Sequence, residues 1–336
     1  MAAADAPRIR SDEPVALVLG AGGARGLAQI GVIEALQARS LNVVAVAGSS
    51  SGALVGGLYA AGKLEVYRDW LYGLSRTDML RLLDPALGQA SLFRGERLMQ
   101  ALRELAGEPR IQDLPIAFTA VAVDLMRQRE VWLREGDLWD AVRASIAIPG
   151  VFTPYEVHGR ELVDGGLLAP LPIAATRLSD AHRLIAVDMH GWPDRPPGTP
   201  AKRNGAAARD ARDEAGDAPA AIAPRGEAGI VVAEHGDDTD TRGAGLLHWF
   251  GERWRRRNSE EAKDAGEHEL GFSELMARSL DTMQAQIARV QLALDPPELV
   301  IRIPRDACQF YEFWRARELI ALGRAEADKA LDAAGY

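Results

Sequence analysis

The sequence predicts an α/β protein with a mainly parallel central sheet flanked by helices. In the first 190 residues, short apolar runs alternate with helical patterns, which is typical of parallel strands joined by helices. The chain has 336 residues, of which 47% are hydrophobic, so a large core can form without metal or disulfides. The single cysteine, Cys308, excludes a disulfide framework and favours a reducing compartment.

Charge and hydropathy restrict the function further. The formal net charge of −9 argues against a nucleic-acid-binding protein and gives no general attraction to anionic lipid. No apolar stretch precedes Val15, so the beginning of the chain does not resemble a secretory signal. Residues 40–62 are uncharged but contain Asn42, three consecutive serines and five glycines, which favours a buried strand, a turn and a helix over a membrane span. We expect a cytoplasmic protein, or one peripheral to the inner face of the membrane.

The elements follow from these runs in chain order. Pro14 precedes VALVL, and residues 15–19 are therefore expected to form a buried strand. A helix is expected over 26–39, a second buried strand over 43–47 and a helix of small residues over 52–61. Further helices are expected within 65–84, 95–106 and 138–148, and strands at 116–123, 130–133, 152–157, 160–163 and 183–189.

The composition changes after Gly191. Residues 192 to about 243 are rich in Ala, Arg, Asp, Gly and Pro with little apolar periodicity, which predicts a flexible insertion. A long helix is expected from Phe272, with apolar positions at Leu275, Leu280, Met283, Ile287 and Leu294. A strand at 299–303 and a helix at 311–334 are expected to follow it. The predicted organisation is an N-terminal tail (1–14), a core (15–190), a low-complexity insertion (191–270) and a C-terminal helix–strand–helix (271–336) that completes the domain.

A glycine-rich loop, GAGGARG, occupies residues 20–26 between the first strand and the first helix. A dinucleotide-binding turn needs G-x-G-x-x-G, but Arg25 stands at the third glycine position, and the phosphate-loop signature is missing. Consecutive glycines can also turn several backbone N–H groups toward one point, where the helix N-terminus adds positive potential. Such a loop suits an oxyanion, although a plain strand-to-helix turn stays open.

Residues 48–52, GSSSG, fit the pattern G-x-S-x-G with Ser50 in the centre. The motif lies between a buried strand and a helix, which is the setting of a nucleophile elbow. Gly48 and Gly52 are small enough to let neighbouring chain pass. This context favours a catalytic Ser50, although the bare pattern arises by chance in sequences rich in Ala, Gly and Ser.

Asp164, Gly165 and Gly166 form a DGG motif at the end of a predicted strand. A carboxylate there could accept the proton of the Ser50 hydroxyl, provided that burial raises its pKa from about 3.9. Taken alone, the motif is an ordinary Asp-Gly turn. A Ser-His-Asp arrangement is the alternative, and His190, at a strand end, is the only histidine well placed for it.

In this order and separation, GAGGARG, GSSSG and DGG resemble the motifs of bacterial patatin-like phospholipases. The flanking segments GLAQIGVIEAL, GSSSGALVGGLYA and RASIAIPGVFTPYEV strengthen the resemblance, which extends from about residue 15 to 188 and resumes weakly at 272–334. It implies the patatin-like three-layer α/β fold and a serine lipid acyl hydrolase, a carboxylic ester hydrolase without metal or cofactor. A phospholipid or another acyl-ester lipid would be its substrate.

The resemblance also implies roles for individual residues. By position, Ser50 is the nucleophile and Asp164 the general base of a Ser–Asp dyad without histidine. The oxyanion hole is formed by Gly22, Gly23 and Ala24, with Arg25 orienting the loop, and the motif glycines are Gly48, Gly52, Gly165 and Gly166. One departure is Ala21, which stands where many members have glycine.

Two other functions compete with this one, a Ser-His-Asp esterase that uses His190 and a catalytically silent lipid-binding regulator. The presence of both Ser50 and Asp164 counts against the silent protein. Residues 246–257, LLHWFGERWRRR, place Leu247, Phe250 and Trp254 on one helical face beside arginines, as in a helix that contacts a membrane peripherally. A helix packed on the domain is the simpler interpretation. No nucleic-acid partner is expected.

Overall fold

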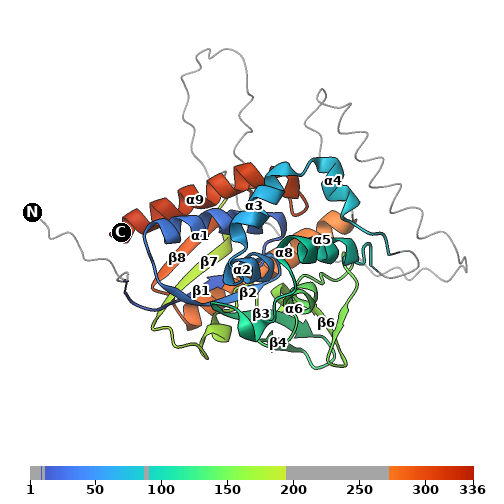
Figure 1. Ribbon diagram of the computed structural model, residues 1–336, viewed down its shortest axis with the longest axis horizontal. Coiled ribbons are helices and arrows are strands. Elements are labelled where there is room, and N and C mark those ends of the chain that lie inside the picture. The colour runs from blue at the N-terminus through green and yellow to red at the C-terminus, as the bar shows by residue number, and fades with distance from the viewer. Residues whose placement is uncertain (1–8, 10–11, 87–90, 194–271) are drawn as a thin grey trace, which may run out of the picture. The chain divides into compact units, whose positions relative to one another are not determined.

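An eight-stranded sheet organises the part of the chain that the computed structural model describes (Figure 1). The structure describes residues 9, 12–86, 91–193 and 272–336, which belong to one compact unit. The strand order is β5-β6-β3-β2-β1-β7-β8, and β4 pairs with β3 outside this path. The strands are β1 (Val15–Leu19), β2 (Val43–Ser49), β3 (Ala117–Asp124), β4 (Arg129–Leu133), β5 (Tyr155–Val157), β6 (Arg160–Asp164), β7 (Arg183–Gly191) and β8 (Leu299–Pro304).

Five neighbouring strands, β3, β2, β1, β7 and β8, run parallel, whereas β4, β6 and β5 are antiparallel to their partners. Parallel neighbours need crossover connections, and helices supply the first two, α1 after β1 and α2 after β2. The predicted α/β class with a mainly parallel sheet is confirmed. The described helices are α1 (Ala28–Ala38), α2 (Ser51–Ala60), α3 (Leu64–Gly73), α4 (Arg76–Arg81), α5 (Glu96–Ala106), α6 (Leu138–Ser145), α8 (Phe272–Leu294) and α9 (Ala316–Ala333).

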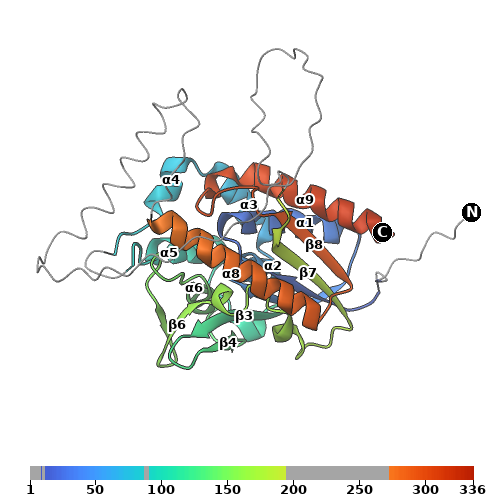
Figure 2. The same ribbon diagram turned by 180° about the vertical axis from the view of Figure 1, so that it is seen from behind.

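The sheet is covered on both faces. Successive side chains of a strand point to opposite faces, so each face can pack against its own layer of helices. Leu17 and Leu19 of β1 belong to the main core cluster, which also contains buried residues of α1, α2 and α9. Val18, between them, belongs to a second cluster with Ile173 and with Ala288 of α8. Figure 2 shows α8 running across the face that carries this second cluster. Helices on both faces of one sheet give the three layers of the predicted fold.

The C-terminal helix α9 lies along α1 (Figure 1). The two backbones approach at Gly31 and Gly323: a Cβ at Gly31 would meet the carbonyl oxygen of Ile320, and one at Gly323 would meet that of Ala28. At the end of α1, Arg39 forms an ion pair of 2.8 Å with Asp332. Residues at opposite ends of the sequence thus build one layer.

The predicted elements agree with this fold at most positions. Strand β1 occupies the predicted residues, β2 is two residues longer than expected, and α8 begins at Phe272 as expected and extends to Leu294, the last apolar position named for it. The insertion, the face formed by Leu247, Phe250 and Trp254, and most of the N-terminal tail lie outside the described residues. Among the residues that are described, no helix is long and apolar enough to cross a membrane.

Candidate active site

Ser50 occupies the turn between β2 and α2. Its backbone angles, φ 55° and ψ −124°, lie in a region that residues with a side chain rarely adopt, so the turn holds it under strain. Glycine is needed on both sides, since a Cβ at Gly48 would meet the Gly52 carbonyl and one at Gly52 would meet the Leu19 carbonyl. The side chain of Ser50 is nevertheless buried, with 4% of the residue exposed.

The hydroxyl of Ser50 donates a hydrogen bond to Asp164 Oδ2 at 2.6 Å. The register of the sheet explains why residues 114 positions apart meet. Strands β2 and β6 pair with consecutive stretches of the same edge of β3, whose other edge pairs with β4: Ser49 lies opposite Val121, and Asp164 lies opposite the next residue, Ala122. One strand therefore brings the serine turn and the DGG turn together.

The environment of Asp164 changes its acidity. Burial raises the pKa of this carboxyl to about 7, while hydrogen bonds from the Ser50 hydroxyl and from the Gly166 N–H, the latter at 2.7 Å, act in the opposite direction. A carboxylate with a pKa near 7 is matched to proton transfer at neutral pH. The chain can approach so closely because position 165 is glycine: a Cβ there would meet the Val121 carbonyl.

The glycine loop follows β1 and continues into a 3-10 turn over Gly23–Leu27. The N–H of Ala24 donates to the Phe310 carbonyl at 2.9 Å, and that of Arg25 donates to the Gly22 carbonyl at 3.2 Å. In the described part of the chain, the N–H groups of Gly22 and Gly23 have no backbone acceptor. An amide that already donates to a carbonyl is a poor donor to a second acceptor, so among the residues expected at an oxyanion hole Gly22 and Gly23 are the better candidate donors.

Ser145, at the end of α6, contacts the Ser50 turn and was not singled out by the sequence motifs. Its hydroxyl accepts the N–H of Ser50 at 2.9 Å and donates to the Val121 carbonyl at 2.6 Å. Two residues later, the Ala147 carbonyl accepts the N–H of Asp164 at 2.9 Å. The end of α6 thus fixes both members of the Ser50–Asp164 pair. The segment RASIAIPG, which contains Ser145, was the only signal in the sequence.

His190, the alternative base, lies in a different environment. Its Nδ1 is 3.5 Å from Asp188 Oδ1 and its Nε2 is 3.7 Å from Asp281 Oδ1, and the side chain is almost fully buried. The Ser50 hydroxyl is directed to Asp164 instead. The structure therefore brings together Ser50 and Asp164 but places His190 near two other carboxylates.

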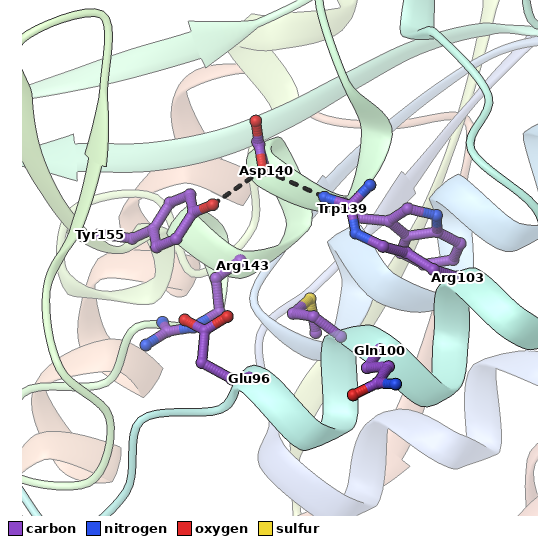
Figure 3. A pocket seen from close by; sticks show the side chains of 8 residues that line it. Glu96, Gln100, Arg103, Trp139, Asp140, Arg143 and Tyr155 are labelled. Carbon is purple, nitrogen blue, oxygen red and sulfur yellow. Dashed lines mark hydrogen bonds and ion pairs between the residues drawn. The ribbon is translucent and has the colours of Figure 1, made fainter. Parts of the chain in front are cut away.

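A hollow of about 190 Å³ lies between α5, α6 and β5 (Figure 3). Tyr155 donates a hydrogen bond to Asp140 at 2.8 Å, and Arg103 donates to the same carboxylate at 3.3 Å. Arg143, also in its lining, is buried and donates to Thr153 Oγ1 at 2.9 Å. None of the three motifs contributes to this lining.

Among the described residues, no three His, Cys, Asp or Glu side chains gather as metal ligands would.

Comparison with known proteins identifies the family of this chain. Residues 17–177 match the family model of patatin-like phospholipases. An uncharacterized NTE family protein of Mycobacterium tuberculosis is 42% identical to the chain, over 99% of this chain and 96% of that protein. A patatin-like phospholipase domain-containing protein of Caenorhabditis elegans is 33% identical over 54% of the chain. Lysophospholipase NTE1 of Saccharomyces cerevisiae is 30% identical over 56% of the chain. These two matches cover only 14% and 12% of the longer relatives.

Proposed function

The chain belongs to the patatin-like phospholipase family, and from this membership and the geometry around Ser50 we propose that it is a serine hydrolase of lipid acyl esters. The observation that carries the proposal is the hydrogen bond of 2.6 Å between the Ser50 hydroxyl and Asp164 Oδ2. The yeast relative is named a lysophospholipase, which supports a phospholipid or lysophospholipid as the substrate class.

In the acylation step, Asp164 takes the proton of the Ser50 hydroxyl while Ser50 Oγ attacks the ester carbonyl. The new oxyanion accepts hydrogen bonds from the N–H groups of Gly22 and Gly23. In enzymes where one such donor has been removed, the loss is about 2.7–4 kcal/mol of transition-state stabilisation. Asp164 then returns the proton to the leaving alcohol oxygen, and the ester bond breaks to leave an acyl-Ser50.

Deacylation repeats the chemistry with water in place of the serine. Asp164, again a carboxylate, takes a proton from water, and the hydroxide oxygen attacks the acyl carbonyl. The oxyanion lies against the same two amides, and the proton on Asp164 passes to Ser50 Oγ as the fatty acid leaves. A pKa near 7 suits both steps, because the group must lose and regain a proton in each.

Covalent labelling with a fluorophosphonate probe tests the proposal. The wild-type chain should be labelled, and mass mapping should place the modification on Ser50. Ser50→Ala should lose both the label and the hydrolysis of a short-chain acyl ester. Ser51→Ala is the matched control, because it removes the neighbouring buried hydroxyl and should retain the label. Labelling at any other residue, or turnover by Ser50→Ala above trace level, contradicts the proposed nucleophile.

A further inference from the structure

The glycine loop, residues 20–26, is bonded to residues of the C-terminal segment 272–336. Arg25, which follows the two proposed donor amides, is buried, and its Nη2 donates to Asp281 Oδ1 of α8. Its Nη1 donates to the carbonyl of Arg305 at 2.7 Å, and the Phe310 carbonyl accepts the N–H of Ala24. All three acceptors lie beyond residue 177, where the match to the family model ends.

Helix α8 lies close to both parts of the candidate site. Asp281 contacts Arg25 on the glycine loop, and Gln284, one turn later, is so near the DGG turn that a Cβ at Gly166 would meet its Nε2. The helix runs across this face of the sheet in Figure 2. Its inward face therefore carries polar side chains beside the small buried residues Ala285 and Ala288.

A buried guanidinium needs a partner, because an unpaired buried charge is costly. Asp281 is the carboxylate that supplies it, since the other hydrogen bond of the Arg25 side chain goes to a neutral carbonyl. Arg25 and Gly23 belong to the same 3-10 turn. Fixing the guanidinium thus fixes the direction in which the N–H groups of Gly22 and Gly23 point. Such donors act only when they are aligned before the reaction.

We propose that Asp281 is a positioning residue for the oxyanion loop and acts through Arg25. The proposal rests on the proposed function for its effect on catalysis. It also assigns a role in the reaction to a helix that lies outside the matched family region. Asp281 touches no reacting atom; it keeps the loop amides aligned with the place where the oxyanion forms.

A second carboxylate, directly after the C-terminal end of the same helix, provides a matched control. Asp295 Oδ2 accepts a hydrogen bond from Arg177 Nη2 at 2.8 Å, so this pair also joins α8 to the rest of the domain. The Asp295 pair is more exposed and does not touch the glycine loop. Asp281→Asn should lower kcat by about 10- to 100-fold with KM within twofold, because aligned donors bind charge that develops only in the transition state. Asp295→Asn should leave both constants unchanged.

The route through Arg25 is tested by combining substitutions. In an Arg25→Gln background, Asp281→Asn should lower kcat by less than a further twofold, since two residues of one pathway do not act additively. Asp281→Glu keeps the charge and should restore part of the lost rate. Equal kcat values for Asp281→Asn and Asp295→Asn, or full additivity with Arg25→Gln, would overturn the proposal.

Hydrogen–deuterium exchange separates this proposal from the proposed function. In full-length protein, peptides covering residues 20–27 should exchange faster in Asp281→Asn than in wild type, and Asp295→Asn should resemble wild type. If the wild-type chain is not labelled at Ser50 by fluorophosphonate, the proposed chemistry fails, while the exchange rates still decide whether Asp281 orders the loop. Unchanged exchange in Asp281→Asn would overturn the positioning role whatever the outcome of the labelling.

Discussion

The carboxyl group of Asp164 accepts the N–H of Gly166 and is the proposed acceptor of the Ser50 proton, and a single substitution separates these two roles. Asn at this position keeps the size of the side chain and can still accept the Gly166 N–H, but it cannot take a proton. Asp164→Asn should therefore lower kcat for acyl-ester hydrolysis by about 10²–10⁴, the usual contribution of a general base. Steady-state kinetics on a short-chain ester measure this. A near wild-type rate, combined with a dead His190→Ala, would indicate a histidine base instead.

Thermal stability shows whether the lost activity of Asp164→Asn reflects unfolding. The pKa of Asp164 is raised in the folded state to about 7, so the folded protein binds this proton more tightly than the unfolded chain does. Between pH 4 and 7, the Asp164 contribution to stability consequently declines as pH rises, on the order of 1 kcal/mol per pH unit. The Asn variant lacks this decline and should melt at a higher temperature than wild type at pH 8, with a smaller difference at pH 5.

The same raised pKa predicts the pH dependence of the rate. Only the carboxylate form of Asp164 can accept the Ser50 proton, so activity requires the group to be deprotonated. Well below pH 7, kcat/KM should fall by nearly tenfold for each pH unit, and it should level off above about pH 8. A pH profile from 5.5 to 8.5 on a neutral ester tests this. A profile flat across that range would show that Asp164 titrates elsewhere or is not the base.

Ser145 should matter for stability and for rate. Its hydroxyl is the acceptor for the buried N–H of Ser50 and the donor to the Val121 carbonyl. Ser145→Ala leaves both groups unpaired, which costs about 1–3 kcal/mol, and it releases the strained Ser50 turn, so kcat should drop by about tenfold. Chemical denaturation and kinetics measure the two effects. Ser179→Ala, which removes a hydroxyl whose hydrogen bond among the described residues goes to the Thr176 carbonyl, is the control and should leave kcat unchanged.

At the scale of elements, the strands were easier to predict than the faces of the helices. Strand β1 follows directly from Pro14 and the run VALVL, because a strand buried on both faces needs an uninterrupted apolar run. Helix α8 was predicted over the correct residues, yet its apolar positions Leu275, Met283 and Leu294 are 49%, 56% and 79% exposed. Periodicity shows that a helix has an apolar face but does not say which face the domain uses.

The inward face of α8 was unpredictable for a physical reason. It packs through the small residues Ala285 and Ala288 and presents Asp281 and Gln284 to the two glycine-rich turns. The glycines of those turns leave room beside the backbone, and the polar groups that fill it come from a helix more than a hundred residues away in the sequence. No local pattern in the sequence records such a pairing.

At the contact between α1 and α9, a Gly→Ala substitution should lower stability instead of raising it. Replacing a glycine inside a helix by alanine normally stabilises it by up to about 1 kcal/mol. At Gly323, however, the new Cβ would meet the backbone carbonyl of Ala28, and a backbone cannot rotate away. Gly323→Ala should therefore destabilise the protein by about 1–3 kcal/mol. Gly73→Ala in α3, where a Cβ meets no described atom within 4 Å, should be neutral or stabilising. Equal melting temperatures for the two variants would contradict this packing.

For the whole molecule, the sequence predicted the residues of the candidate site better than it predicted the residues that hold them in place. The order of GAGGARG, GSSSG and DGG singled out Ser50 and Asp164 through its resemblance to the patatin-like motifs, and the structure places each motif at the end of a strand of one sheet. The register that places Asp164 opposite Ala122 and Ser49 opposite Val121 depends on pairings between distant strands. Asp281 and Ser145 depend on the same long-range packing, so neither residue was identified from its local sequence.

The last 65 described residues should be essential for folding, although they lie outside the matched family region. Strand β8 pairs with β7, and α9 covers α1. Together they bury five large apolar side chains, Ile301, Ile303, Leu319, Ile320 and Leu331. Burying each contributes about 1.5–3 kcal/mol, so their sum is comparable to the whole stability of a typical domain, about 5–15 kcal/mol.

A chain that ends at residue 193 should accordingly show no cooperative thermal transition by circular dichroism, whereas the full chain should. The control is a full-length chain that lacks residues 195–240. The composition of that stretch, rich in Ala, Asp, Gly and Pro, predicts little apolar surface able to join a core, so its removal should leave the transition nearly unchanged. A cooperative transition in the chain ending at 193 would show that residues 15–193 fold alone and that β8 and α9 only extend the sheet. A lost transition in the control would show instead that residues 195–240 are part of the folded domain.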